Sequence, residues 1–152
     1  MNKQLLIKVK KTLLLFMLLL TAVSCSLDDD DANFHYEFVP VVAAEFPENF
    51  VLGSTYTIPV EFARPTECHF FSNFSFTRPD NTTRRIGVVN SVFTDRDCSD
   101  ISGDESIQTN SFDFMVIYEG TYTFQFWTGE DADGNNQYLE IQVPVLTEAP
   151  SN

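Results

Sequence analysis

The chain has 152 residues, of which 22 are Asp or Glu and 9 are Lys or Arg, so its formal net charge is −13. Such an acidic surface repels nucleic-acid backbones and anionic lipid head groups, which excludes both as partners bound through charge. The length suits one domain with one hydrophobic core and is too short for two.

Residues 1–24 have the features of a secretion signal. Four lysines precede an unbroken apolar run at 13–20, and small residues connect this run to Cys25. A core of about ten apolar residues is too short to span a bilayer stably. We therefore expect cleavage before Cys25, which leaves 152 − 24 = 128 residues. All four lysines lie in the removed part, so the formal charge becomes (9 − 4) − 22 = −17.

The segment 25–33 predicts how the mature protein is anchored. A cysteine directly after the cut indicates lipidation, and the acidic residues that follow lack periodicity, as expected of a disordered tether. The run 25–31 resembles the start of surface-displayed lipoproteins of the Bacteroidota. The resemblance implies palmitate on Cys25, an outer-membrane location facing the cell exterior, and an export signal made of Ser26, Asp28, Asp29, Asp30 and Asp31.

Residues 34–146 alternate apolar and polar side chains, a pattern typical of strands with one buried face. Pro59 lacks a backbone donor, which favours a sheet edge or an irregularity for its strand. About seven short strands predict a single all-β domain, an antiparallel two-sheet sandwich. The expected strands are 34–42, 55–62, 68–78, 84–93, 112–118, 120–128 and 137–145, and a disordered tail is expected at 147–152.

The last third of the chain carries a second resemblance. Residues 119–126 read EGTYTFQF, an Asp-Gly turn follows, and 138–143 read YLEIQV. This order resembles the closing hairpin of bacterial immunoglobulin-like and PKD-like domains. It implies an immunoglobulin-like sandwich in which Tyr122 forms a tyrosine corner.

The two remaining cysteines, Cys68 and Cys98, form an even pair in an oxidising compartment, which predicts a disulfide. Because Cys98 lies in the polar stretch 94–105, we expect the bridge to tie a loop to a strand. The alternative is a metal site, which lacks ligands. His35 and His69 are the two histidines, and no Cys-x-x-Cys or His-x-x-x-His spacing accompanies them.

Catalysis is not expected, and neither is a cofactor. Both histidines occupy odd positions that the alternation places on the outward face, and no nucleophile motif lies near either. With 22 acids, pairs of carboxylates arise by chance and indicate no glycosidase.

One loop resembles a calcium motif. If Gly134 is position six of an EF-hand loop, then Asp131, Asp133 and Glu140 fall at positions three, five and twelve, although position one is a glycine. The flanking segments look like strands, so Asp133-Gly134 is more economically a hairpin turn in which both residues have positive φ. A weak structural calcium site here, or in the acidic loop 95–105, is the alternative.

The same hairpin predicts an aromatic platform. Alternation places Trp127 and Tyr138 on the outward face as direct or diagonal cross-strand neighbours, beside Gln125 and Gln142. Flat aromatic faces flanked by hydrogen-bonding groups suit sugar rings or a partner's apolar side chains. The alternative is that the pair only stabilises the hairpin or is covered by the N-terminal segment.

Small lipoproteins of the lineage that this chain resembles often accompany outer-membrane complexes or bind glycans. We therefore expect a noncatalytic interaction or accessory subunit of an outer-membrane protein complex for transport or secretion, held to the membrane by lipid alone. The alternative function is a glycan- or matrix-binding surface module that uses the exposed aromatic face.

The assignment of the anchor predicts the behaviour of Cys25→Ser. The variant should lose acyl labelling and remain as an uncleaved or soluble precursor, because no other group attaches the domain to lipid. Metabolic labelling and membrane fractionation measure this. Normal labelling of the variant would contradict the assignment.

Overall fold

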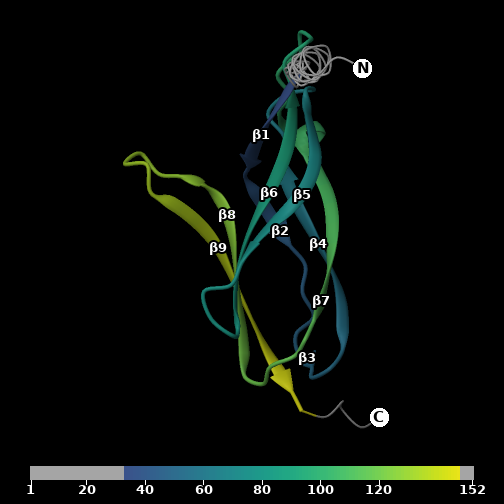
Figure 1. Cartoon of the computed structure of the whole chain (residues 1–152), viewed down its shortest axis with the longest axis vertical. Coiled ribbons are helices and arrows are strands. Elements are labelled where there is room, and N and C mark those ends of the chain that lie inside the picture. The colour runs from purple at the N-terminus through teal and green to yellow at the C-terminus, as the bar shows by residue number, and fades with distance from the viewer. Residues whose placement is uncertain (1–32, 148–152) are drawn as a thin grey trace, which may run out of the picture. The chain divides into compact units, whose positions relative to one another are not determined.

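A computed structural model of the protein describes residues 33–147, and this part of the chain is all-β (Figure 1). Two sheets enclose a hydrophobic core, consistent with the predicted sandwich. The predicted signal peptide, Cys25 with the export signal, and the tail from residue 148 lie outside the described residues. The elements are β1 (Phe34–Val39), β2 (Val41–Ala44), β3 (Phe50–Val51), β4 (Thr55–Ala63), β5 (His69–Thr77), β6 (Thr83–Phe93), the 3-10 turn η1 (Gly103–Ser106), β7 (Ile107–Met115), β8 (Thr121–Glu130) and β9 (Asn136–Leu146).

Residues 33–147 contain nine strands, two more than the sequence predicted. The predicted strand 34–42 is interrupted at Pro40 and becomes β1 and β2, which belong to different sheets. Pro40 has no N–H to give to a ladder, which favours an interruption at this residue. The additional β3 has only two residues, too few for alternation to reveal it.

The larger sheet has the strand order β1-β6-β8-β9-β3, with β5 also paired to β6, and the smaller sheet has the order β2-β4-β7. The prediction of a purely antiparallel sandwich is wrong, because β6 pairs with β8 in parallel and β3 pairs with β9 in parallel. The mixed sheet curls into half a barrel. Residue patterns specify which face of a strand is buried, but not the direction of its neighbour.

One edge of β6 carries two different strands. β5 occupies one edge of β6 along residues 85–92. Any other strand that pairs with this stretch must therefore lie on the opposite edge of β6. There β8 pairs with residues 83–86 and β1 with residues 88–93. Gly87 lies between the two stretches, and β1 and β8 diverge at this residue. The outer half of the β8–β9 hairpin accordingly projects away from the other strands (Figure 1).

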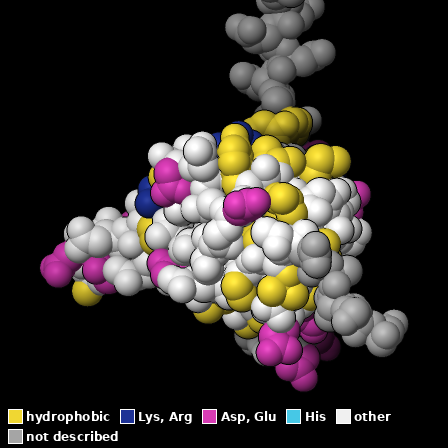
Figure 2. Space-filling model, turned by 90° about the horizontal axis from the view of Figure 1, so that it is seen from below, with side chains coloured by type: hydrophobic (Ala, Val, Ile, Leu, Met, Phe, Trp, Pro, Cys, Tyr) yellow, Lys and Arg dark blue, Asp and Glu magenta, His cyan; other side chains and the backbone are white. Residues whose placement is uncertain are grey.

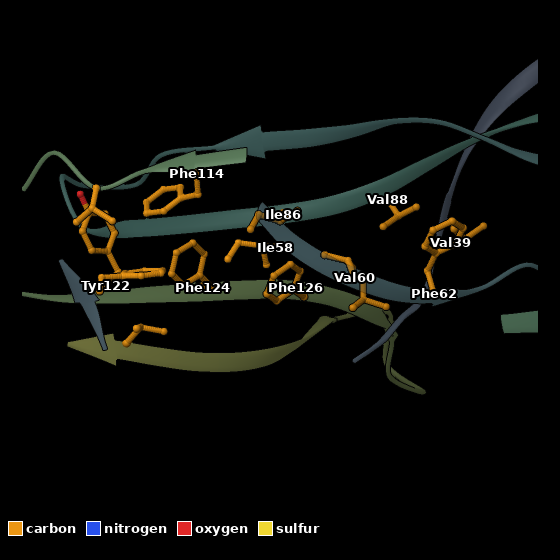
Figure 3. Close-up of a cluster of buried hydrophobic side chains, with 14 residues drawn as sticks. Val39, Ile58, Val60, Phe62, Ile86, Val88, Phe114, Tyr122, Phe124 and Phe126 are labelled. Carbon is orange, nitrogen blue, oxygen red and sulfur yellow. The ribbon is translucent and has the colours of Figure 1, made fainter. Parts of the chain in front are cut away.

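The core lies between the two sheets, with rows of apolar side chains from β4, β6 and β8 (Figure 3). Tyr122, Phe124 and Phe126 of β8 are fully buried, as the alternation predicted. The Tyr122 hydroxyl accepts hydrogen bonds from the backbone N–H groups of Ile117 (3.2 Å) and Tyr118 (3.0 Å). These bonds make Tyr122 a tyrosine corner that fixes the connection from β7 into β8.

β5 departs from the predicted alternation. Its register with β6 shifts between Phe71 and Asn73, so the residues before and after the shift are out of phase. Before the shift His69 is buried and Phe70 is 45% exposed, whereas after it Phe74 packs against the core. The expectation that His69 faces outward is therefore wrong.

Pro59 lies on β4, the central strand of the smaller sheet, and not at a sheet edge. The sheet accommodates it because β2 ends at Ala44, after a register shift between Val41 and Ala43. The Pro59 carbonyl accepts a hydrogen bond from the N–H of Glu45, just beyond the end of β2 (3.0 Å). The backbone nitrogen of Pro59, which has no hydrogen to donate, thus faces the side of β4 on which β2 has already ended.

The predicted disulfide between Cys68 and Cys98 is present, with Cα atoms 5.6 Å apart. Cys68 stands one residue before β5 and Cys98 lies in the loop after β6, so the bridge ties two loops together. The backbone supports it, because Glu67 N–H donates to the carbonyl of Ser99 (3.1 Å).

Reduction of the disulfide should destabilise the domain. The bridge closes a loop with a sequence separation of 30, which in the chain-entropy model corresponds to roughly 3 to 4 kcal/mol of unfolding free energy. We expect the midpoint of thermal unfolding to fall by several degrees on reduction. Titration of free thiols in the unreduced domain is the control, and two free thiols or an unchanged midpoint would contradict the prediction.

Candidate functional site

The outward face of the larger sheet brings the predicted platform residues together. Trp127 and Tyr138 are directly opposite each other in the register of β8 and β9, and Gln125 is opposite Glu140. A register shift between Trp127 and Gly129 follows immediately, so the pair lies where the hairpin begins to bend. The geometry of the pair is the one that the sequence predicted.

Trp127 is half-buried and held on two sides. Its ring centroid is 5.9 Å from that of Phe38 on β1, and its indole N–H donates to the Asn136 side-chain oxygen (2.7 Å). The contact with Phe38 exists because β1 and β8 diverge from the same edge of β6. The ring is therefore positioned before any partner binds.

Tyr138 is flanked by a connected set of polar side chains. The guanidinium of Arg85 lies 4.9 Å from the Tyr138 ring centroid and also donates to the Gln125 side-chain oxygen (3.2 and 3.3 Å). Gln125 and Gln142 each donate to the Glu140 carboxylate at 3.2 Å. The two predicted glutamines thus belong to one network across β6, β8 and β9, which orients Arg85 beside the aromatic face.

A groove of about 260 Å³ lies at this point on the outward face. Its apolar walls are the rings of Phe38, Trp127 and Tyr138. Gly87 also lines the groove, and the Phe38 ring packs directly over it. An added Cβ at residue 87 would stand 2.6 Å from that ring, so only glycine leaves the ring in this place. Polar groups complete the lining: Ser75, Thr77, Arg85, Glu130 and Asn136.

The apolar surface continues from this groove along β1. A second hollow of about 330 Å³ shares Phe38 and Ser75 with the groove and extends to Tyr36. Tyr36 is 63% exposed and Phe38 is 49% exposed. We call the surface formed by Tyr36, Phe38, Trp127 and Tyr138 the aromatic surface.

The hairpin loop considered for calcium uses its main carboxylate internally. The Asp131 carboxylate accepts hydrogen bonds from the backbone N–H groups of Asp133 and Asn135 (both 2.9 Å) and from the Gln137 side chain (2.9 Å). These bonds, above all those from Asn135, lower the pKa of Asp131. Of the two turn residues, only Gly134 has positive φ, so the predicted turn with positive φ at both residues is wrong.

The loop is instead a turn closed by Gly134 N–H donating to the carbonyl of Asp131 (3.0 Å), with glycine in the left-handed region. Acidic side chains gather at the end of the projecting hairpin (Figure 2). Among residues 33–147 no three His, Cys, Asp or Glu side chains are grouped to hold a metal ion.

The two histidines lie beside the same carboxylate, that of Glu37 on β1. The Glu37 carboxylate is 3.5 Å from His35 Nε2 and 3.7 Å from His69 Nε2. His69 Nδ1 is 2.8 Å from the Thr66 hydroxyl. None of these residues lines the groove beside Trp127.

Sequence reasoning found Trp127, Tyr138 and the glutamines but missed Phe38 and Arg85. Both missed residues come from strands that are distant in sequence, and the fork at Gly87 brings them to the hairpin. One signal was present, since the apolar even-numbered residues of β1 alternate with polar residues at 35 and 37.

Comparison with protein-family models, curated proteins and solved structures finds no match for this chain. Within the described residues, no helix has the length and apolarity needed to cross a membrane.

Proposed function

We propose that this protein is a noncatalytic interaction subunit, anchored by lipid on Cys25 and displayed on the exterior of an outer membrane, where it serves a transport or secretion complex. The observation that carries the proposal is the aromatic surface, which is exposed at Tyr36 and Phe38, half-buried at Trp127 and Tyr138, and continuous across two hollows. The domain itself is proposed to be immunoglobulin-like, and the tyrosine corner at Tyr122 supports this.

The composition of the aromatic surface favours a protein partner. Trp, Tyr and Arg dominate the binding energy at protein interfaces, and Trp127, Tyr138 and Arg85 lie in contact here. The network that holds Arg85 and the bond from Trp127 to Asn136 order these side chains in advance, which lowers the entropy cost of binding.

The tether suits a module that engages a neighbouring membrane protein. The eight residues 26–33 follow Cys25, and an extended chain of this length reaches about 25 Å. The lipid would hold the domain near the surface while leaving it free to orient, which raises its effective concentration around a partner in the same membrane.

Glycan binding is the second candidate, and the groove beside Trp127 favours it. A volume of about 260 Å³ with aromatic walls and with Arg85, Glu130 and Asn136 in its lining offers both stacking and hydrogen bonds to a sugar ring. A glycan binder should retain glycans as an isolated soluble domain, whereas an interaction subunit should require its membrane partner.

We predict that Trp127→Ala weakens binding by more than about 1 kcal/mol, or roughly fivefold, with only a small effect on stability. The test is extraction in mild detergent with quantification of the copurified membrane protein, together with a glycan array probed with the soluble domain. Val42→Ala, which removes a 51% exposed apolar side chain from the other sheet, is the matched control.

Retained binding by a folded Trp127→Ala variant would contradict the assignment of the aromatic surface. Strong destabilisation with binding intact per folded molecule would instead assign Trp127 and Tyr138 to holding the hairpin together. Glycan retention by the isolated domain would favour the second candidate.

A further inference from the structure

A larger groove lies between β5 and β7 and adjoins the groove of the aromatic surface at Thr77, which lines both. Its volume is about 460 Å³. Phe76, Met115 and Ile117 line it with apolar groups and are each 49 to 59% exposed. The ring of Phe112 on β7 lies 5.1 Å from that of Phe76 and forms the base where the two strands approach. An apolar groove of this kind requires a partner with an apolar portion.

The groove also contains a buried arginine. Arg84 is 6% exposed, and its guanidinium lies against the rings of Phe114 (5.7 Å) and Tyr122 (5.3 Å), which contact each other. Its hydrogen bonds go to neutral backbone carbonyls, of Asn81 (3.0 Å) and Thr83 (2.8 Å) among others. Among the ion pairs of residues 33–147 none includes Arg84. The charge of Asp80 favours the Arg84 cation from beyond ion-pair distance. A buried cation without a directly paired carboxylate is costly, and an anionic ligand would stabilise it further.

A second arginine faces the same groove. Arg78, which is exposed, lines it together with Arg84, so two of the five arginines in a strongly acidic chain converge here. Burial, followed by the charge of Arg78, lowers the pKa of Arg84, as expected of two like charges in proximity. Asp113 also lines the groove, but its carboxylate accepts a hydrogen bond from the Thr57 hydroxyl (2.6 Å). The groove therefore combines apolar walls with two arginines and a single carboxylate, that of Asp113.

The strand that forms one wall has a free edge. Among the strands of residues 33–147, β7 pairs only with β4, and Ser111 is opposite Pro59. The Pro59 carbonyl bonds toward β2, so Pro59 and Ser111 form a pair without ladder hydrogen bonds, and the backbone N–H and C=O of Ser111 point away from β4. With a period of two, the same holds for Asp113 and Met115, both of which line the groove.

We propose that this groove binds the carboxyl terminus of an extended polypeptide, which adds a strand to the free edge of β7 and places its terminal carboxylate against Arg78 and Arg84. The free backbone groups of Asp113 and Met115 favour a peptide over a lone anion, because they supply the main-chain hydrogen bonds of strand addition. The apolar side chains of the groove receive alternate side chains of the peptide. This site is separate from the aromatic surface and does not depend on its role.

The test uses the soluble domain and an array of random-sequence hexapeptides, synthesised in parallel with free carboxyl termini and as carboxyl-terminal amides. Hydrogen bonds to a charged group are worth about 1.5 to 3 kcal/mol, so the carboxylate forms should bind at least about tenfold more tightly than the matched amides. A peptide with the sequence of residues 147–152 is included, which reports capture of the carboxyl terminus of another copy.

Two variants separate charge from fold. Arg78→Ala changes an exposed side chain and should reduce the preference for the carboxylate, whereas Arg96→Ala, an exposed arginine outside the groove lining, should leave it unchanged. Met115→Pro removes an N–H from the free edge and should weaken binding of both peptide forms, with Thr109→Pro outside the groove as its control. Absence of binding peptides, or equal binding of carboxylates and amides, would overturn the proposal.

Discussion

The sharing of one edge of β6 between two strands is the constraint on which the rest of this structure depends. β8 occupies the first part of that edge and β1 the second, and the change of partner falls at Gly87. Two strands cannot occupy the same stretch of one edge. The β8–β9 hairpin therefore separates from β6 after Phe126, and the edge of β8 beyond this residue no longer pairs with β6. Trp127 is the first residue of β8 beyond the stretch that pairs with β6, so the divergence itself places an aromatic ring at the sheet surface.

Each of the two candidate binding regions lies where neighbouring strands do not pair: one at the fork between β1 and β8, the other between β5 and β7. At the fork, Phe38 covers Gly87 and contacts Trp127, and a groove with aromatic walls results. On the other side, β5 and β7 each pair with a single strand, and the space between them contains Arg84 without a carboxylate partner among the described residues. The tyrosine corner holds the connection from β7 into β8, and the disulfide holds the loops before β5 and after β6. Both open regions are therefore features of topology, whereas their chemistry comes from a few side chains.

Much of the fold could be predicted because burial in a strand has a period of two. The inward positions of Tyr122, Phe124 and Phe126, and the pairing of Trp127 with Tyr138, required only that period and an approximate turn. The errors occur where one extra residue changes the phase, as at His69. Strand direction was also missed, since an apolar run does not record whether its neighbour is parallel. Phe38 and Arg85 could not be assigned to the groove without knowing that β1 and β8 share an edge. The anchor at Cys25, by contrast, depends on local sequence alone, and it stays a prediction.

The most direct test of this account is the tryptophan fluorescence of Gly87→Ala, since Trp127 is the only tryptophan in the chain. An added Cβ would stand 2.6 Å from the Phe38 ring and must displace it, while the backbone of Gly87 lies outside the region that strains an alanine. The account predicts a folded domain in which Trp127 loses its contact with Phe38, so that its emission shifts to the red and a neutral quencher reaches it more readily. Ser75→Ala, which lines the same groove from β5, opposite Gly87 on the edge of β6 that carries a single strand, should leave the emission unchanged. An unaltered Trp127 signal in a folded Gly87→Ala protein would contradict the claim that the fork at Gly87 forms the groove.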